Sequence, residues 1–270
     1  MERRDFLKFA ATTAAAMAVQ GNLPLLAAGK KRKKMSDQGP SNCLSKPPAI
    51  EPITGYVEQF SPASAGSMAK AFKARYSLIH WNGAAAKSRN SEQGSLDIAW
   101  SDGKLSTTET RSNRPSNTVK TSVQCAGKHN TASSWALSSS FSGNAGQSFT
   151  EKGGWDGKTM TVKAKSWTQE SVTKNPLIAR WALLPLIASG SLKKSPLAFD
   201  MLDDSTLRPN QTLRYEGQIT VPVKGGEAKL DSYVQTGDAI VPTHYLVDNQ
   251  GRVQLITMSM VNWALTELKG

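Results

Sequence analysis

Residues 213–221 read LRYEGQITV, and this stretch alternates between apolar and polar side chains more regularly than any other part of the chain. Successive side chains of a β-strand point to opposite faces of its sheet, so a period of two predicts a strand with one buried and one exposed face. This stretch therefore places the protein among those built mainly from β-strands.

The same alternation continues on both sides of this strand. Toward the C-terminus it predicts strands at 228–236, 242–247 and 252–262. Toward the N-terminus it predicts strands at 76–81, 96–100, 104–110, 119–125, 135–141 and 160–164. Ser101-Asp102-Gly103 has the residues of a tight hairpin turn. Strands joined by such short turns favour an antiparallel sheet.

The last predicted strand carries apolar residues on both of its faces. Val253 and Leu255 lie on one face, whereas Ile256, Met258 and Met260 lie on the other. An antiparallel strand with water on one side needs only one apolar face. The pattern therefore predicts either a strand buried on both faces or one whose register is shifted by a β-bulge.

The middle of the chain changes to helical spacing. Asn175 and Pro176 fit an N-cap followed by proline at the first helical position, and Gly190 fits the stop. Pro185 is expected to kink the helix. The positions at helical spacing are Leu177, Trp181, Leu184 and Ala188. Arg180 is the only charge, so this helix should be buried nearly all round or cover an apolar surface.

These patterns predict a mainly β (α+β) fold, with a curved, open antiparallel sheet or half-barrel and an apolar helical segment near 175–190. Residues 51–270 are expected to form this single domain. Residues 29–50 are rich in Lys, Pro and Ser, and are expected to form a flexible arm. Residues 1–28 are expected to be a targeting segment.

The targeting segment resembles a known export signal. Arg-Arg-x-Phe-Leu-Lys is formed by Arg3, Arg4, Phe6, Leu7 and Lys8, and it resembles the bacterial twin-arginine signal. Glu2 stands where that signal prefers Ser or Thr. The resemblance implies passage through the twin-arginine export machinery and a periplasmic or secreted protein. The apolar stretch after the signal is too short and too mild to span a membrane, and no other run approaches that length, so we expect no transmembrane span in the mature chain.

The chain has two cysteines, Cys43 and Cys125. An exported protein meets an oxidising compartment, where a Cys43–Cys125 disulfide would join the arm to the domain. Two free thiols are the alternative.

The net charge of +12 includes five consecutive cations at 30–34. Such a run can attract anionic lipid headgroups, envelope polymers or nucleic acid, or can be a solvated tail. No nucleic-acid reading module stands beside the run, and an exported protein meets little nucleic acid. We therefore expect no nucleic-acid partner.

Residues with catalytic or metal-binding chemistry are sparse. His80, His129 and His244 lie far apart in the sequence and lack metal-ligand spacing, and no nucleophile elbow or phosphate-binding loop occurs. Asp203-Asp204, with Asp200 shortly before, fits either a site for a hard cation or a loop that supplies caps. The sequence therefore predicts no catalytic residue, no metal and no cofactor.

The closing segment PTHYLVDNQGRV, residues 242–253, resembles the P-x-x-x-x-V-D-x-x-G-R-V hairpin of uncharacterised bacterial envelope proteins. Those proteins have a curved, open β-half-barrel and are similar in architecture to the periplasmic lipoprotein carriers. The resemblance covers 175–265 by motif and the rest by strand content. It implies a lipid-sized concave face closed by helices, with no catalytic residues to carry over.

The apolar helix and the two-sided last strand supply the candidate lining of a ligand site: Trp181, Leu184, Ile187, Met258 and Met260. Methionine and aliphatic linings adapt to irregular apolar guests. The leading hypothesis is a non-enzymatic exported envelope protein that binds a lipid or another apolar or amphipathic molecule. The alternatives are an accessory protein that docks onto another exported protein, and a hydrolase-type enzyme without a recognisable motif.

Overall fold

The computed structural model describes residues 48–80, 90–112, 116–142 and 148–270. The predicted export signal, most of the predicted arm and Cys43 lie outside the described residues, so they stay predictions. Within the described ranges, no helix has the length and apolar character needed to cross a membrane.

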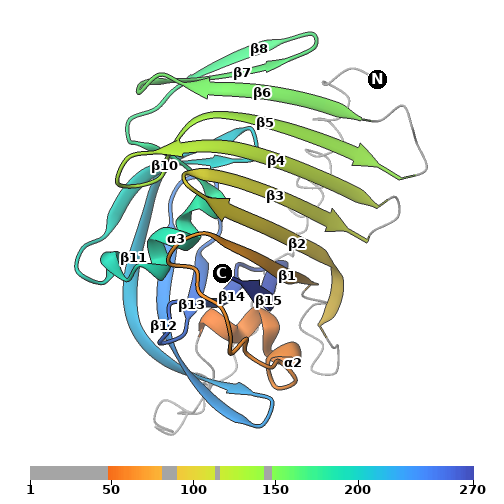
Figure 1. Cartoon of the computed structure of the whole chain (residues 1–270), viewed down its shortest axis with the longest axis vertical. Coiled ribbons are helices and arrows are strands. Elements are labelled where there is room, and N and C mark those ends of the chain that lie inside the picture. The colour runs from red at the N-terminus through yellow and green to blue at the C-terminus, as the bar shows by residue number, and fades with distance from the viewer. Residues whose placement is uncertain (1–47, 81–89, 113–115, 143–147) are drawn as a thin grey trace, which may run out of the picture. The chain divides into compact units, whose positions relative to one another are not determined.

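The described residues form one sheet of fifteen strands with a few short helices (Figure 1). The first eight strands are β1 (Phe72–His80), β2 (Ser91–Ser101), β3 (Lys104–Arg111), β4 (Asn117–Ala126), β5 (Thr131–Phe141), β6 (Phe149–Trp155), β7 (Thr159–Ala164) and β8 (Thr168–Val172). The others are β9 (Leu177–Ala179), β10 (Leu197–Asp203), β11 (Thr206–Val223), β12 (Gly226–Thr236), β13 (Thr243–Val247), β14 (Val253–Thr257) and β15 (Val261–Lys269). The short helices are η1 (Pro48–Ile53), α2 (Thr54–Val57), η2 (Arg180–Ala182), α3 (Leu183–Ala188) and η3 (Ser191–Lys193).

The sheet closes on itself because β4 pairs with β5 as well as with β3. The order of hydrogen-bonded neighbours is β4, β3, β2, β1, β15, β14, β13, β12, β11, β10, β9 and β5. With the β4–β5 pairing, these twelve strands form a closed barrel. The mainly β prediction is confirmed, whereas the predicted open sheet or half-barrel is wrong. Closure depends on pairing β1 with β15 and β5 with β9, and pairing between distant segments leaves no local pattern in a sequence.

The barrel wall forks at β5. Thr131 pairs with Ile178 of β9, whereas Ser134–Ser139 pair with β6. The strands β6, β7 and β8 therefore leave the ring as an extension of the sheet, as Figure 1 shows. A Cβ at Gly153 of β6 would lie 2.1 Å from the Trp135 ring, so glycine there lets the indole lie against the strand.

Side chains on the inner face of the barrel form the main core. The fully buried side chains of this core come from different strands and include Tyr76, Leu96, Phe199 and Tyr245. The η2–α3 segment packs among them, since η2 contacts β3 and β10 while α3 contacts β14. Burying one such large apolar side chain stabilises the fold by about 1.5–3 kcal/mol. The predicted apolar segment therefore fills the barrel rather than closing an open sheet.

A second apolar cluster lies on the outer face, where η1 and α2 pack. Ile50 and Ile53 contact a surface that includes Leu246 and Leu255. The predicted boundary at residue 50 falls inside this cluster. Because the outer face is covered here, β14 is buried along its whole length, with Ile256 in the main core. The apolar residues on both faces of the last predicted strand are explained by these two clusters, the main core on the inner face and the η1–α2 cluster on the outer face.

Two details of the closing strands differ from the simple pattern. The pairing of β13 with β14 passes from Leu246–Leu255 to Val247–Val253, so the expected register shift is also present. The single strand predicted at 252–262 is divided, because a turn at 258–260 separates β14 from β15. Asn262 holds this turn, since its side chain accepts from the N–H of Met258 and donates to the carbonyl of Ser259.

The helix predicted at 175–190 is shorter than expected. Leu177–Ala179 form β9 by pairing with β10, so no helix begins after Asn175, whose backbone and side-chain N–H groups donate to Asp200. Pro185 is the third residue of α3, where a missing N–H removes no intrahelical hydrogen bond. Gly190 has a φ of 68° directly after the helix, which confirms the predicted stop.

Asp200 joins three parts of the chain from a buried position. Its carboxylate accepts from the N–H groups of Lys174 at 2.8 Å, Asn175 at 3.2 Å and Asn210 at 2.8 Å, and from the Asn175 side chain at 3.1 Å. Burial alone would raise the pKa of Asp200, but these hydrogen bonds outweigh it and hold the pKa below its usual range. This aspartate therefore has the structural role of the two that the sequence allowed.

We expect Asp200→Asn to lower the free energy of unfolding by about 2–4 kcal/mol, because an amide leaves buried N–H donors without an acceptor. Urea titration followed by tryptophan fluorescence measures this. The folded pKa is depressed, so the contribution is present above the unfolded value near pH 4 and is lost as the pH falls through the folded pKa. The difference between the two proteins should therefore shrink in acid. Glu170→Gln, at an exposed carboxylate of β8, is the control, and an equal loss in both variants would contradict the assignment.

Candidate functional site

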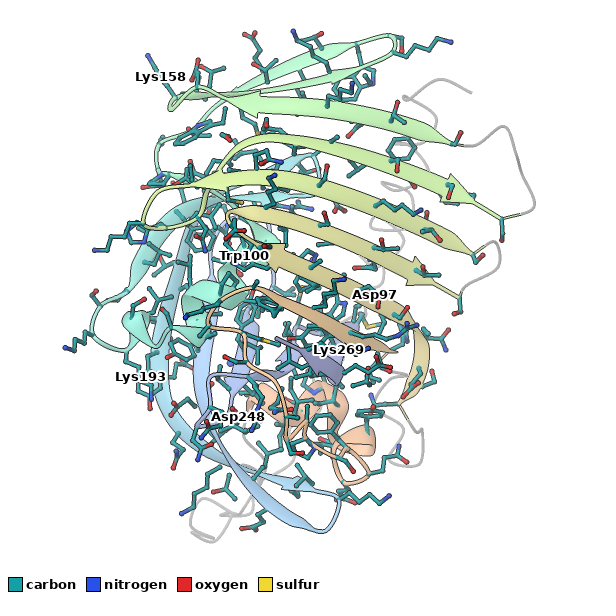
Figure 2. All side chains as sticks on the ribbon, in the orientation of Figure 1. Asp97, Trp100, Lys158, Lys193, Asp248 and Lys269 are labelled. Atoms are coloured by element: carbon teal, nitrogen blue, oxygen red, sulfur yellow. The ribbon has the colours of Figure 1, made fainter. Side chains whose placement is uncertain are left out.

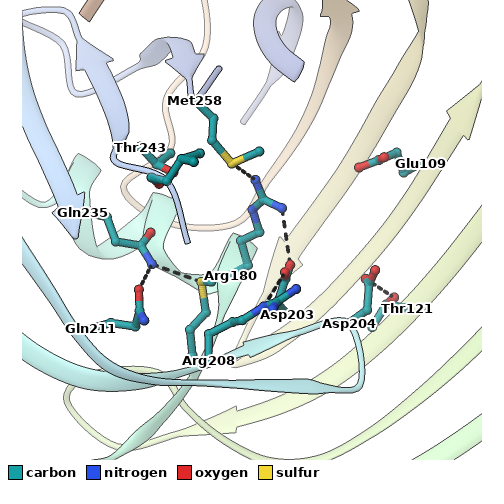
Figure 3. A network of polar contacts seen from close by, with 12 residues as sticks. Glu109, Thr121, Arg180, Asp203, Asp204, Arg208, Gln211, Gln235, Thr243 and Met258 are labelled. Carbon is teal, nitrogen blue, oxygen red and sulfur yellow. Dashed lines mark hydrogen bonds and ion pairs between the residues drawn. The ribbon is translucent and has the colours of Figure 1, made fainter. Parts of the chain in front are cut away.

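A cavity of about 160 Å³ lies between η2, β10, β11 and the loop that joins β12 to β13. Figure 3 shows the polar contacts around it. Its lining consists of Arg180, Met201, Asp203, Arg208, Gln235, Ala239, Ile240, Val241, Thr243 and Met258. The cavity thus combines two cations and one carboxylate with several apolar side chains.

Arg180 is the central cation of this site. Its guanidinium carbon lies 4.7 Å from the ring centres of both Trp181 and Trp263. The two rings are 5.2 Å apart and nearly perpendicular, at 75°. A cation over an indole face is attracted by the ring quadrupole, and the attraction grows as water is removed. Only 16% of the Arg180 side chain is exposed, so this attraction is weakly screened.

Asp203 compensates Arg180 and also binds a second arginine. Its carboxylate lies 3.3 Å from Nη1 of Arg180 and 3.4 Å from Nε of Arg208. Burial is the largest single effect and lowers the pKa of Arg180, but Asp203 together with Tyr245, Glu109 and Asp204 outweighs it and raises the pKa above its usual value. One carboxylate therefore serves two permanent positive charges at the cavity wall.

The second amino group of Arg180 has a weak partner. Nη2 donates to the thioether sulfur of Met258 at 3.5 Å. A thioether is a poor acceptor, and hydrogen bonds from a guanidinium are strongest to carboxylate or phosphate oxygens. The cavity side of Arg180 can therefore gain from an incoming anionic oxygen.

The opposite wall is held by a chain of buried amides. The Tyr245 hydroxyl donates to Gln235 at 2.9 Å, and the Gln235 amide donates to Gln211 at 3.0 Å. The Gln211 amide in turn donates to the carbonyl of Asp238 at 3.1 Å. Burial raises the pKa of Tyr245 above its ordinary value, so its hydroxyl stays a donor. These bonds fix the cavity wall and leave its polar groups satisfied.

Asp204 lies on the other side of Arg180, at the tip of the β10–β11 hairpin, with a φ of 57°. Its Oδ1 accepts from the Thr121 hydroxyl at 3.5 Å. Asp204 keeps contact with solvent, yet surrounding protein raises the pKa of its carboxyl to about 6. The negative charges of Asp203 and Glu109 also raise the pKa of Asp204, whereas the positive charge of Arg180 lowers it. Asp204 therefore changes charge just below neutral pH.

The structure places the five predicted lining residues in different surroundings. Met258 lines the cavity, and Trp181 packs on Arg180 beside it. Leu184 and Ile187 lie in α3 within the main core, and neither lines the Arg180 cavity. Met260 is 47% exposed, in the same turn as Met258. The structure therefore brings together two of the five, around a cation.

Sequence reasoning missed the polar residues of the site. Arg180, Arg208 and Gln235 come from segments more than twenty positions apart, so no local pattern joins them. Arg180 did carry a signal, because it is the only charge in a long apolar segment. A charge in such a segment needs a buried partner and often marks a site.

None of the three histidines lines the Arg180 cavity. His244 lies 3.7 Å from Glu216. Burial lowers the pKa of His244, and Glu216 only partly opposes this. Among the described residues, no three side chains are grouped to hold a metal ion. The described geometry therefore offers the hydrolase hypothesis no catalytic arrangement.

Cys125 is a free thiol packed against the main core. Burial raises the pKa of this thiol to about 12, so the reactive thiolate is scarce at neutral pH. Cys43 lies outside the described residues. The structure therefore gives the predicted Cys43–Cys125 disulfide no support.

Fold and site together define a closed β-barrel protein with a polar interior cavity. No family model and no curated protein match this chain. Among solved structures, the chain is similar to a β-barrel-like protein of domain of unknown function DUF1849 from Brucella abortus. The two share 12% sequence identity with a TM-score of 0.49, over 74% of this chain and 97% of that one. The barrel assignment rests on strand pairing, and this likeness carries no functional argument.

Asp204→Asn should stabilise the protein above pH 6 and leave it unchanged below pH 4. The folded pKa of about 6 exceeds the unfolded value of about 4, so the wild-type protein loses stability as the pH rises between them. Solvent contact limits the gain to about 1 kcal/mol or less. Urea titrations from pH 4 to pH 8 measure it. Asp102→Asn, also at positive φ, controls for turn conformation. A gain that is constant with pH would refute the assigned titration.

Proposed function

We propose that this protein is a non-catalytic binding protein that takes a small amphipathic molecule with an anionic group at the Arg180 cavity. The observation that carries the proposal is the second amino group of Arg180, which faces the cavity with a thioether as its partner. An anionic oxygen of a ligand would be a far better acceptor for this group.

The charges of the cavity favour an anion. Arg180 and Arg208 are permanently positive, whereas Asp203 is the one carboxylate in the lining. The lining by itself therefore has a net charge of +1, while Asp204 and Glu109 act on Arg180 from outside the lining. Since Arg180 is held by two indoles and an ion pair, it does not have to move to receive the ligand, which limits the ordering free energy of binding.

The rim of the cavity favours an apolar tail. Val241 lines the cavity and is 45% exposed, and Met260 is 47% exposed in the turn that holds Met258. Among the described residues these are two of the four large apolar side chains that are exposed. Exposed apolar side chains beside a cavity that also carries charged groups are typical of ligand-binding sites.

The size of the cavity limits what enters it. Pockets that enclose a drug-sized ligand have volumes of about 300–1,000 Å³, and this cavity has about 160 Å³. The head group and the first carbons of a ligand would therefore enter, while the rest of the tail would lie on the rim. This is a narrower hypothesis than a lipid-sized concave face.

Export remains part of the proposal. The series formed by Arg3, Arg4, Phe6, Leu7 and Lys8 supports passage through the twin-arginine machinery and a periplasmic or secreted location. Amphipathic carboxylates and phosphates are abundant near the lipids of a cell envelope, which agrees with the chemistry of the cavity.

A second function, docking onto another exported protein, is supported by the β6–β8 extension. Phe149 and Val172 are 46% and 67% exposed there. The strand β8 ends the sheet order and has one paired edge, so its other edge is available for strand addition.

We expect decanoate to bind the purified protein, and decanol, which lacks the charge, to bind much more weakly. Arg208→Gln should weaken decanoate binding roughly tenfold, because a charge-assisted contact contributes about 1.5–3 kcal/mol. Val241→Ser should weaken both ligands by a similar factor. Isothermal titration calorimetry measures these affinities.

Arg214→Gln, at an exposed arginine paired with Glu216 on β11, is the matched control and should leave decanoate binding unchanged. Equal binding of decanoate and decanol, or no binding of either, would contradict the proposal. Native mass spectrometry of the gently purified exported protein would then show whether it carries any guest.

A further inference from the structure

A second hollow, with a volume of about 260 Å³, lies over β1, β2, β3 and β15. Its lining includes Lys73, Arg75, Asp97, Ser106, Thr108 and Lys269. Figure 2 labels Asp97 and Lys269 on this part of the sheet. None of these residues belongs to the Arg180 cavity, so the two sites are separate.

The strand register explains the shape of this groove. Lys269 of β15 pairs with Lys73 of β1, Lys73 pairs with Ala99 of β2, and Ala99 pairs with Ser106 of β3. Paired residues point to the same face of a sheet. Two long side chains are therefore followed across the sheet by two short ones, which leaves space over Ala99 and Ser106.

The pairing of Lys73 with Lys269 is electrostatically unfavourable. Side chains directly opposite each other have Cβ atoms about 4.5–5.5 Å apart, and like charges in this position destabilise a sheet. Within the described ranges, neither lysine has a carboxylate at ion-pair distance. The groove as a whole holds three cations, Lys73, Arg75 and Lys269, against two carboxylates, Asp97 and Glu267, so its net charge is +1.

Arg75, the third cation of the groove, differs from the lysines. It pairs with Glu267 across one neighbouring strand and with Asp97 across the other. Its Nη1 lies 3.6 Å from the Asp97 carboxylate, with both side chains about half exposed. The carboxylates of the groove thus surround Arg75, and the excess charge of the groove belongs to the lysine pair.

We propose that this groove binds a phosphate group over Ala99, one strand from Lys73 and one strand from the Ser106 hydroxyl, with the long side chain of Lys269 reaching it from β15. A phosphate monoester carries a charge of about −1.5 to −2 at pH 7 and three acceptor oxygens. That charge suits two neighbouring lysines without a carboxylate at ion-pair distance within the described ranges, and three oxygens offer more acceptors than a carboxylate does. Binding would turn the lysine repulsion into two favourable contacts.

The phosphate can be free in solution or carried by a lipid headgroup, and both offer the same chemistry. Inorganic phosphate tests the first source, by calorimetry in a phosphate-free buffer. Vesicles of phosphatidylcholine with phosphatidic acid test the second, by co-sedimentation against vesicles of phosphatidylcholine alone. Binding should weaken as the salt concentration rises, because the lysines are exposed. Binding to neither probe would overturn the proposal.

Lys73→Glu distinguishes this site from a general effect of charge. We expect it to weaken phosphate or vesicle binding roughly tenfold, a change of about 1.4 kcal/mol. The same variant should raise the melting temperature, because an opposite-charge pair replaces the lysine pair. Loss of binding with a gain of stability cannot come from misfolding. Lys269→Glu should behave in the same way.

Lys158→Glu is the matched control. Lys158 is exposed in the turn between β6 and β7, and its replacement by glutamate changes the net charge by the same amount as Lys73→Glu. We expect it to leave binding unchanged. An equal loss of binding in Lys158→Glu and Lys73→Glu would overturn the proposal, as would unchanged binding in Lys73→Glu.

Discussion

The pairing of β1 with β15 is the constraint on which the barrel depends. It joins the first described strand to the last over a register from Lys73–Lys269 to His80–Val261. Without it both strands would expose a row of unpaired backbone groups, which are costly wherever water cannot reach them. The enclosed interior, and with it the cavity beside Arg180, exists because this pairing closes the ring on that side.

A buried guanidinium then shapes the interior. A charge in a protein core is tolerated when it is paired and hydrogen-bonded, and Arg180 meets this need with Asp203 and two indole faces. The two indoles lie on the same side of the guanidinium, since their ring centres are only 5.2 Å apart, and the edge next to Met258 stays weakly bound. The same arrangement that makes the charge tolerable therefore also leaves it available to a ligand.

The sequence predicted the local elements well and the long-range ones poorly. Alternation and turn residues located most strands, because a strand's faces and a hairpin's turn are set by neighbouring residues. Barrel closure was missed because it depends on partners far apart in the chain. The helix after Asn175 was drawn too long because Leu177–Ala179 pair as a strand with residues 200–202 of β10, which are distant in sequence. The site was only partly found, since its apolar members have periodicity whereas Arg208 and Gln235 have none.

At the fork on β5, the barrel wall is closed by a very short pairing between β5 and β9. One residue pair, Thr131 with Ile178, joins β5 to β9, whereas eight residue pairs join β1 to β15. A local opening between β5 and β9 breaks far fewer backbone hydrogen bonds than an opening between two strands with a long pairing. The free energy of opening is therefore lower at β5–β9 than at the long pairings. The short β5–β9 pairing thus lies beside the point where β6 joins β5, so a force on the β6–β8 extension acts on this pairing. A partner that pulls on the extension would loosen the barrel at a defined place and leave the long pairings intact.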